Sequence, residues 1–200
     1  MTMKHTKITQ RERFQMGKIG PEGFPPCGDM VSLIKRLEGD GLKIGGSVLD
    51  AGCGQCRFGR YLSQLTPITS VLGVDQSGEA ISIARARRPG RVENKLEFRN
   101  EEIDTFLKSN NNKFSIVGAF NILEYVDKPG QTLSRLQTSV KTNGFLVGSV
   151  YLGEILPDAK NAWETVEEFQ KDFPKLTVVD LNKNLGCIVF IYQKIKGRKT

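Results

Sequence analysis

The feature that most constrains the fold is the order of the apolar segments along the chain. The sequence predicts short apolar strands at 47–50, 70–75, 96–99, 114–120 and 145–150. Helices are predicted between them, at 57–65, 79–87, 104–108 and 131–140. Continuous apolar strands that alternate with helices are typical of a parallel sheet covered on both faces. The sequence therefore predicts an α/β fold.

The last part of the chain breaks this alternation. After a predicted helix at 163–173, two strand candidates at 176–181 and 187–192 are separated only by a short stretch that contains Asn-Lys-Asn-Leu-Gly. This connection is too short for a crossover helix, so the two strands must pair antiparallel as a hairpin. Trp163, at the start of the tail helix, is predicted to be a core residue.

Length and composition indicate a single domain. Two hundred residues, of which 38% are hydrophobic and 26% charged, can bury a core without disulfides or a structural metal. The segment 1–28 is predicted to be an arm or lid, and 29–200 one domain that opens with a helix capped by Asp29. No apolar run reaches the roughly 18 residues of a membrane span, and the N-terminus does not resemble a secretory signal. We therefore expect a cytoplasmic protein with reduced cysteines and no membrane contact.

The charge balance leaves the partner open. A formal charge of +7, from 29 Lys and Arg against 22 Asp and Glu, makes nucleic acid a possible partner. The excess is spread over modest clusters at 4–13, 85–91 and 194–199, none of which is a long basic run with interleaved aromatic residues. Nothing in the sequence indicates an oligomeric state.

The stretch Asp-Ala-Gly-Cys-Gly-Gln-Cys at 50–56 follows the first strand and opens a helix. Its glycines permit positive φ and close approach of a ligand to the backbone, beside the N–H groups of a helix N-terminus. Its two cysteines have the spacing of a thiol redox site or of half a zinc site. Zinc would need two more ligands, and Cys27, Cys187 and His5 lack paired spacing, so no metal site is predicted. A redox site would not need glycines at 52 and 54, so no redox function is predicted either.

Other glycine-rich loops do not match this stretch. The dinucleotide pattern would place its third glycine at 57, where the sequence has Arg57, and no Gly-Lys-Ser/Thr of a P-loop follows. The second strand ends in an acid, Asp75, about twenty residues after the loop, where a carboxylate can accept ribose hydroxyls.

These residues together resemble class I S-adenosylmethionine-dependent methyltransferases. Asp50, Gly52 and Gly54 match the family's Asp/Glu-x-Gly-x-Gly-x-Gly motif, with Cys56 in the place of the third glycine. The fourth strand leads into Asn-Ile-Leu-Glu-Tyr-Val at 121–126, which resembles Asn-x-Leu-Glu-His-Val of one branch, with Tyr125 replacing the His. The terminal hairpin resembles the family's sixth and seventh strands.

The resemblance implies a Rossmann-like, doubly wound, mostly parallel sheet of seven strands with a C-terminal antiparallel hairpin. It implies S-adenosyl-L-methionine as the cofactor, with Cys53 as filler and Cys56 near the ligand. The implied cofactor-binding residues are the loop positions, the ribose acid and its neighbour, one acid after the third strand and the asparagine after the fourth: Asp50, Ala51, Gly52, Cys53, Gly54, Cys56, Asp75, Gln76, Glu101, Glu102 and Asn121.

The implied function is methyl transfer to a small-molecule acceptor. The charge favours one alternative, a methyltransferase acting on RNA or protein. Cys56 and Tyr125 favour another, a catalytically degenerate methyltransferase fold that serves as a binding subunit. The acceptor surface is expected from the N-terminal arm and the loops 123–130 and 151–163, with Glu124, Tyr125, Tyr151 and Asp158 as candidates; no catalytic residue is predicted.

Overall fold

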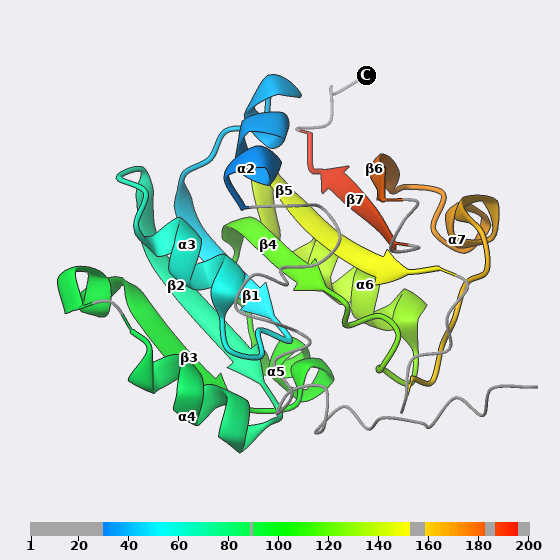
Figure 1. Ribbon diagram of the computed structural model, residues 1–200. Helices are drawn as coiled ribbons and strands as arrows, with labels where there is room; N and C mark the ends of the chain where they lie inside the picture. Colours follow the sequence, from blue (N-terminus) through cyan, green and yellow to red (C-terminus); the bar gives the residue numbers. More distant parts are fainter. Residues whose placement is uncertain (1–29, 89, 153–158, 183–186, 196–200) are drawn as a thin grey trace, which may run out of the picture.

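The computed structural model describes residues 30–88, 90–152, 159–182 and 187–195, which form one seven-stranded sheet (Figure 1). The strands are β1 (Gly46–Ala51), β2 (Ile68–Asp75), β3 (Leu96–Asn100), β4 (Phe114–Phe120), β5 (Val140–Tyr151), β6 (Thr177–Asn182) and β7 (Cys187–Gln193). Their order across the sheet is β3-β2-β1-β4-β5-β7-β6. The first five strands pair in parallel, whereas β7 is antiparallel to both β5 and β6. The predicted fold class and the terminal hairpin are confirmed.

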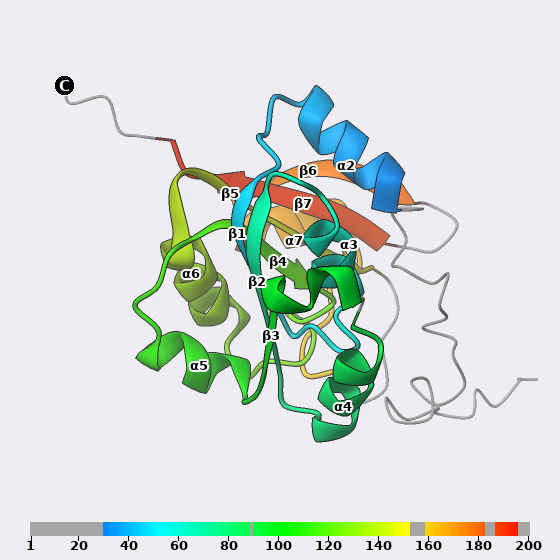
Figure 2. The ribbon, with the colours of Figure 1, turned by 90° about the vertical axis from the view of Figure 1, so that its left-hand side faces the viewer.

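Helices cover both faces of the sheet, as the edge view shows (Figure 2). One face carries α2 (Met30–Gly39), α3 (Arg57–Ser63) and α4 (Gly78–Ala86), and the other carries α5 (Ile103–Ser109), α6 (Pro129–Ser139) and α7 (Val166–Asp172). The core divides accordingly, because successive strand residues point to opposite faces. Val48 packs in the cluster under α3, and its neighbour Leu49 packs in the cluster under α5 and α6. None of the helices in the described ranges is long and apolar enough to cross a membrane.

Several boundaries differ from the sequence prediction, most clearly at β5. β5 begins at Val140, directly after α6, although the helical spacing of Leu133, Leu136 and Val140 predicts a helix to 140. Val140 is buried against Phe114 of β4, and a buried apolar residue suits either element. A 3₁₀ turn at Gly90–Lys95, which the sequence does not predict, precedes β3.

The tail helix is shorter than predicted. Trp163 precedes α7 and forms a bridge with Leu152 instead of opening the helix. Its ring is buried edge-on against Phe169, with centroids 5.4 Å apart, and its indole N–H donates to Asp172. The prediction that Trp163 is a core residue is confirmed. The predicted arm at 1–28 and the cap at Asp29 lie outside the described residues.

Gly148 tests how closely β5 packs between its neighbours. A Cβ at Gly148 would lie 2.3 Å from the carbonyl oxygen of Ala119 and 2.5 Å from the Phe190 ring. We expect Gly148→Ala to lower the free energy of unfolding by about 1–3 kcal/mol, because the backbone must move to admit the methyl group. The matched control is Gly130→Ala in α6, where a Cβ meets nothing within 4 Å. It should raise the free energy of unfolding by about 0.5–1 kcal/mol in a urea titration. Equal stability of the two variants would contradict this packing.

Candidate functional site

The glycine-rich loop joins β1 to α3 at the carboxyl edge of the sheet. β2 and β4 lie on opposite sides of β1, so the strand order reverses here, and doubly wound sheets bind ligands at such a point. Gly52 and Gly54 both have positive φ, of 62° and 51°. A Cβ on Gly52 would lie 2.6 Å from Ile122, whereas a Cβ on Gly54 would meet nothing within 4 Å. Packing therefore requires the first glycine, and the second borders open space that a ligand can approach.

Asp50 and Cys56 lie beneath this loop. Asp50 is 3% exposed, and its Oδ2 accepts a 3.0 Å hydrogen bond from the N–H of Gly59 in α3. Burial raises the pKa of Asp50 to about 7, although the hydrogen bonds from Gly59 and the Cys56 thiol favour its ionised form. Cys56, at the N-cap of α3, is fully buried and left-handed, with φ 54°. These two residues fasten the start of α3 to β1.

The two cysteines of the loop differ in exposure. Cys53 is half-buried, whereas Cys56 has no exposed surface. The sequence interpretation gives Cys53 no role and places Cys56 near the ligand. The complete burial of Cys56 does not match that interpretation. The reason is the left-handed turn at Cys56, which directs its side chain into the core between α3 and β2.

Asp75 connects the end of β2 to the loop. Its Oδ2 accepts a 2.7 Å hydrogen bond from the N–H of Gly54, and its Oδ1 accepts one of 2.8 Å from the N–H of Ser77. Burial raises the pKa of Asp75, and these two N–H groups oppose that rise. A carboxylate offers about four acceptor positions, so two remain for hydroxyl groups of a ligand.

Asn100, at the end of β3, belongs to the same constellation. Its side-chain amide donates to the carbonyl oxygens of Asp75 and Gln76, at 3.0 and 2.9 Å. The sequence prediction did not single out Asn100 or Gly59 as site residues. An amide directly at the end of the third strand was the signal for Asn100, because the carboxyl ends of parallel strands share one edge.

The two acids after β3 have different surroundings. Glu101 is half-buried, and its N–H donates to the Asp75 carbonyl at 3.0 Å, which places it beside β2. Glu102 is the N-cap of α5 and accepts from the N–H groups of Asp104 and Thr105. Although burial opposes it, these hydrogen bonds lower the pKa of Glu102. The first turn of α5 thus occupies the Glu102 carboxylate.

Asn121 lies at the end of β4 with a positive φ of 51°. Its N–H donates to the Ser149 carbonyl at 2.9 Å, and its side-chain oxygen accepts from the Ser149 hydroxyl. These bonds hold Asn121 against β5. Gln76, after β2, is exposed.

Glu124 fastens the loop after β4 to the segment after β5. Its Oε1 accepts from the N–H of Tyr151 at 3.0 Å, and its carbonyl oxygen accepts from the N–H groups of Lys160 and Asn161. Glu124 is 2% exposed, and its Oε2 has no hydrogen-bond partner among the described residues. Burial raises its pKa to about 7, against the effect of the Tyr151 N–H. Tyr125 is half-buried beside it, and Asp158 lies outside the described residues.

Three arginines gather on the outer side of the loop. The Arg87 guanidinium donates to the Gln55 side chain, and the Arg60 guanidinium donates to the carbonyl oxygens of Cys56 and Arg87. Partial burial lowers the pKa of Arg57, and the charges of Arg60 and Arg87 lower it further. The flank formed by α3 and the end of α4 is therefore positively charged. The described ranges contain no group of three His, Cys, Asp or Glu side chains that could hold a metal ion.

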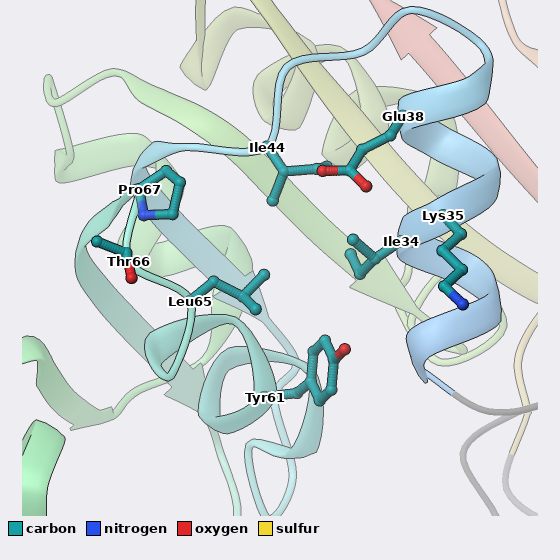
Figure 3. Close-up of a pocket in the computed structure, with 8 residues that line it drawn as sticks. All are labelled: Ile34, Lys35, Glu38, Ile44, Tyr61, Leu65, Thr66 and Pro67. Atoms are coloured by element: carbon teal, nitrogen blue, oxygen red, sulfur yellow. The ribbon is translucent and has the colours of Figure 1, made fainter.

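A pocket of about 280 Å³ opens between α2 and the end of α3 (Figure 3). Ile34, Lys35 and Glu38 of α2 face Tyr61 and the segment 65–67 across it. Two of its lining residues, Ile44 and Pro67, precede β1 and β2. The pocket therefore lies toward the amino edge of the sheet, away from the glycine loop, and is not the candidate cofactor site.

Residues 49–146 match the family model described as "Methyltransferase domain", a span that includes the loop, Asp75, Asn100 and Asn121. This part of the chain is similar to methyltransferase domains. The prediction of a methyltransferase made from the sequence is confirmed at this level.

Curated proteins that resemble the chain are also methyltransferases. The chain is 28% identical over 102 residues to the mitochondrial ubiquinone biosynthesis O-methyltransferase of Candida albicans, covering 50% of this chain and 31% of that enzyme. It is 23% identical over 161 residues to the malonyl-[acyl-carrier protein] O-methyltransferase of Halalkalibacterium halodurans, covering 80% of this chain and 56% of that enzyme. The chain thus spans less than two thirds of the length of either enzyme.

A solved structure, the DhpI–SAH complex, is similar in fold, with a TM-score of 0.64, 18% identity and 94% of each chain covered. This likeness extends over nearly the whole chain, beyond the span that the family model matches. The Rossmann-like, doubly wound fold expected from the sequence is confirmed.

The buried carboxyl of Glu124 should make the stability of the methyltransferase domain depend on pH. Its pKa is about 7 in the folded protein, whereas the usual pKa of a glutamate side chain is 4.5, so folding favours the protonated form. The resulting stabilisation is present at low pH and is lost as the pH rises from about 4.5 through 7. From pH 5 to pH 8, the unfolding free energy of wild type should fall by about 2 kcal/mol more than that of Glu124→Gln, which has no carboxyl to ionise.

Urea titrations at the two pH values measure this difference. The matched control is Glu97→Gln, the same substitution at a side chain that is 66% exposed, and it should follow the wild-type profile. A Glu124→Gln variant whose stability falls in parallel with wild type would contradict the buried carboxyl.

Proposed function

We propose that this chain is an S-adenosyl-L-methionine-dependent methyltransferase that methylates an oxygen atom of a small-molecule acceptor. One observation carries the proposal. Gly54, which has a positive φ and open space beside its Cα, donates its N–H to the Asp75 carboxylate at 2.7 Å. Both curated relatives named above are O-methyltransferases, which supports an oxygen acceptor.

The residues present fit the cofactor. Asp75 has acceptor positions left for two ribose hydroxyls, and Gly54 has no Cβ to block the approach of a ligand to the loop. Of the two acids after β3, Glu101 is the one that we place near the adenine, because Glu102 caps α5. Gln76 and Asn121 lie at the neighbouring strand ends and complete the binding edge.

Other predicted cofactor residues support the loop from below. Asp50, Ala51 and Cys56 are buried, so we propose that they shape the loop rather than contact the ligand. Cys53 is only half-buried, so we propose that it lies nearer the ligand than Cys56 does.

When bound, the cofactor supplies a sulfonium methyl group that an acceptor oxygen can displace in line. The contribution of the protein is to orient the acceptor and exclude water. Glu124 holds the acceptor-side wall in place through Tyr151 and the segment at 160–161. A carboxylate acceptor needs no base, whereas a phenolic hydroxyl must lose its proton.

Methyl transfer to a nucleic acid is the second candidate. The three arginines beside the loop favour it, since they form a positive flank next to the proposed cofactor site. The third alternative is a catalytically degenerate fold that serves as a binding subunit, and absence of cofactor binding would favour it over both enzymes.

Replacing the ribose acid tests the proposed cofactor site. Asp75→Asn keeps the shape of the side chain but removes its charge, so we expect about 10- to 100-fold weaker binding of S-adenosyl-L-methionine, a loss of about 1.5–3 kcal/mol. Isothermal titration calorimetry measures it. The control is Glu97→Gln, which removes an exposed charge from the neighbouring strand and should bind as wild type does. Unchanged affinity of Asp75→Asn would refute the ribose contact. Absence of wild-type binding at millimolar cofactor would refute the proposed methyltransferase activity.

Salt-dependent binding of a mixed-sequence RNA oligonucleotide separates the two acceptor classes. We expect no measurable binding at about 0.2 M salt, because a small-molecule enzyme needs no phosphate contacts. If RNA binds instead, replacing Arg60 and Arg87 by Gln should reduce the slope of log K against log salt by about 2. Replacing Lys171 and Lys175, which are exposed on α7 and beside it, should leave that slope unchanged.

A further inference from the structure

Cys53 and Cys56 are held at a separation that a disulfide can bridge. The N–H of Cys56 donates to the carbonyl oxygen of Cys53 at 2.7 Å, and this bond closes a four-residue turn. The first and last Cα atoms of such a turn lie within about 7 Å of one another. Disulfides join Cα atoms that are about 4.4–6.8 Å apart.

The two sulfurs also converge. If Gly73 of β2 carried a Cβ, that atom would lie 3.0 Å from the Cys53 Sγ and 3.2 Å from the Cys56 Sγ. Both sulfurs therefore lie beside the same residue of β2. A Cβ on Gly59 would lie 2.6 Å from the Cys56 Sγ, so glycines at 59 and 73 leave the room that the sulfur pair occupies.

The pair is asymmetric in its exposure. Cys53 is half-buried, whereas Cys56 has no exposed surface. Cys187, the third cysteine among the described residues, is buried in β7 and is no part of this turn. The geometry is that of a half-buried thiol with a second thiol beside it, close enough for a disulfide.

We propose that Cys53 and Cys56 form a dithiol site that hydrogen peroxide closes reversibly into a disulfide. The Cys53 sulfur attacks one peroxide oxygen, so an S–O bond forms, the O–O bond breaks and one water leaves. The Cys56 sulfur then attacks the Cys53 sulfur, so the S–S bond forms, the S–O bond breaks and a second water leaves. The two sulfurs together lose two electrons, the peroxide gains them, and both thiol protons end in water.

The surroundings of the thiols set the pH dependence of this reaction. The hydrogen bond from Cys56 lowers the pKa of Cys53, but burial and the carboxylates of Asp50 and Asp75 raise it by more. The hydrogen bond with Cys53 and burial raise the pKa of Cys56. Because the thiolate is the reacting species, oxidation should be slow at neutral pH and faster as the pH rises towards 9.

Closing the disulfide should change the cofactor loop. An S–S bond of about 2.05 Å draws the Cys56 sulfur away from Asp50 and Gly59, where the loop is fastened to α3. We expect about tenfold weaker binding of S-adenosyl-L-methionine after oxidation. This consequence rests on the proposed function, whereas formation of the disulfide does not.

The test is peptide mapping of the reduced full chain after treatment with hydrogen peroxide and alkylation of the remaining thiols. The expected result is a peptide spanning 50–60 that is unalkylated and lighter by two hydrogens, and that dithiothreitol restores. Cys187→Ser should give the same disulfide, and Cys56→Ser should instead leave a sulfenic acid on Cys53 that dimedone traps.

Three outcomes would overturn the proposal: both thiols stay open to alkylation, Cys53 is oxidised only to sulfinic acid, or Cys53 pairs with a different cysteine. If Cys56→Ser does not fold, the wild-type map decides alone. Calorimetric titration of the reduced and oxidised proteins separates the two proposals. A reduced protein that does not bind the cofactor refutes the proposed function, and a protein that binds it but forms no disulfide refutes the dithiol site.

Discussion

The hydrogen bond from the N–H of Gly54 to the Asp75 carboxylate is the contact on which the shape of the site depends. It joins two residues 21 positions apart and ties the β1–α3 loop to the end of β2. A hydrogen bond to a charged group contributes about 1.5–3 kcal/mol, enough to hold a loop whose glycine tolerates many conformations. Two acceptor positions of the same carboxylate hold the loop and the neighbouring Ser77, and we propose that the other two receive the ribose hydroxyls.

Buried carboxyls connect the strand ends on both sides of this contact. Asp50 fastens α3 beneath the loop, and Glu124 fastens the loop after β4 to the segment after β5. Both accept from backbone N–H groups rather than from lysine or arginine, so burial raises the pKa of each to about 7. The domain thus holds both sides of its binding edge with groups whose protonation is linked to stability.

The sequence predicted the parts of the fold that hydrophobic periodicity and connection length determine. The seven strands and the terminal hairpin follow from short apolar runs and one short connection. The start of β5 at Val140 does not, because the residue fits the helical spacing of α6 as well as it fits the strand. In the site, the sequence located the loop and Asp75, but the direction of each sulfur depends on the left-handed turn at Cys56. The role of Asn100 as a clamp depends on contacts between strand ends. Glu102 instead caps α5 through local hydrogen bonds from Asp104 and Thr105.

The most direct test of this account is a crystal structure of the chain with S-adenosylhomocysteine. We expect the ribose hydroxyls to contact the Asp75 carboxylate and the backbone of Gly54 to lie against the ligand. We expect the ligand sulfur to face the wall that Glu124 holds. A ligand found in the pocket between α2 and α3, or a ribose that does not contact Asp75, would contradict it.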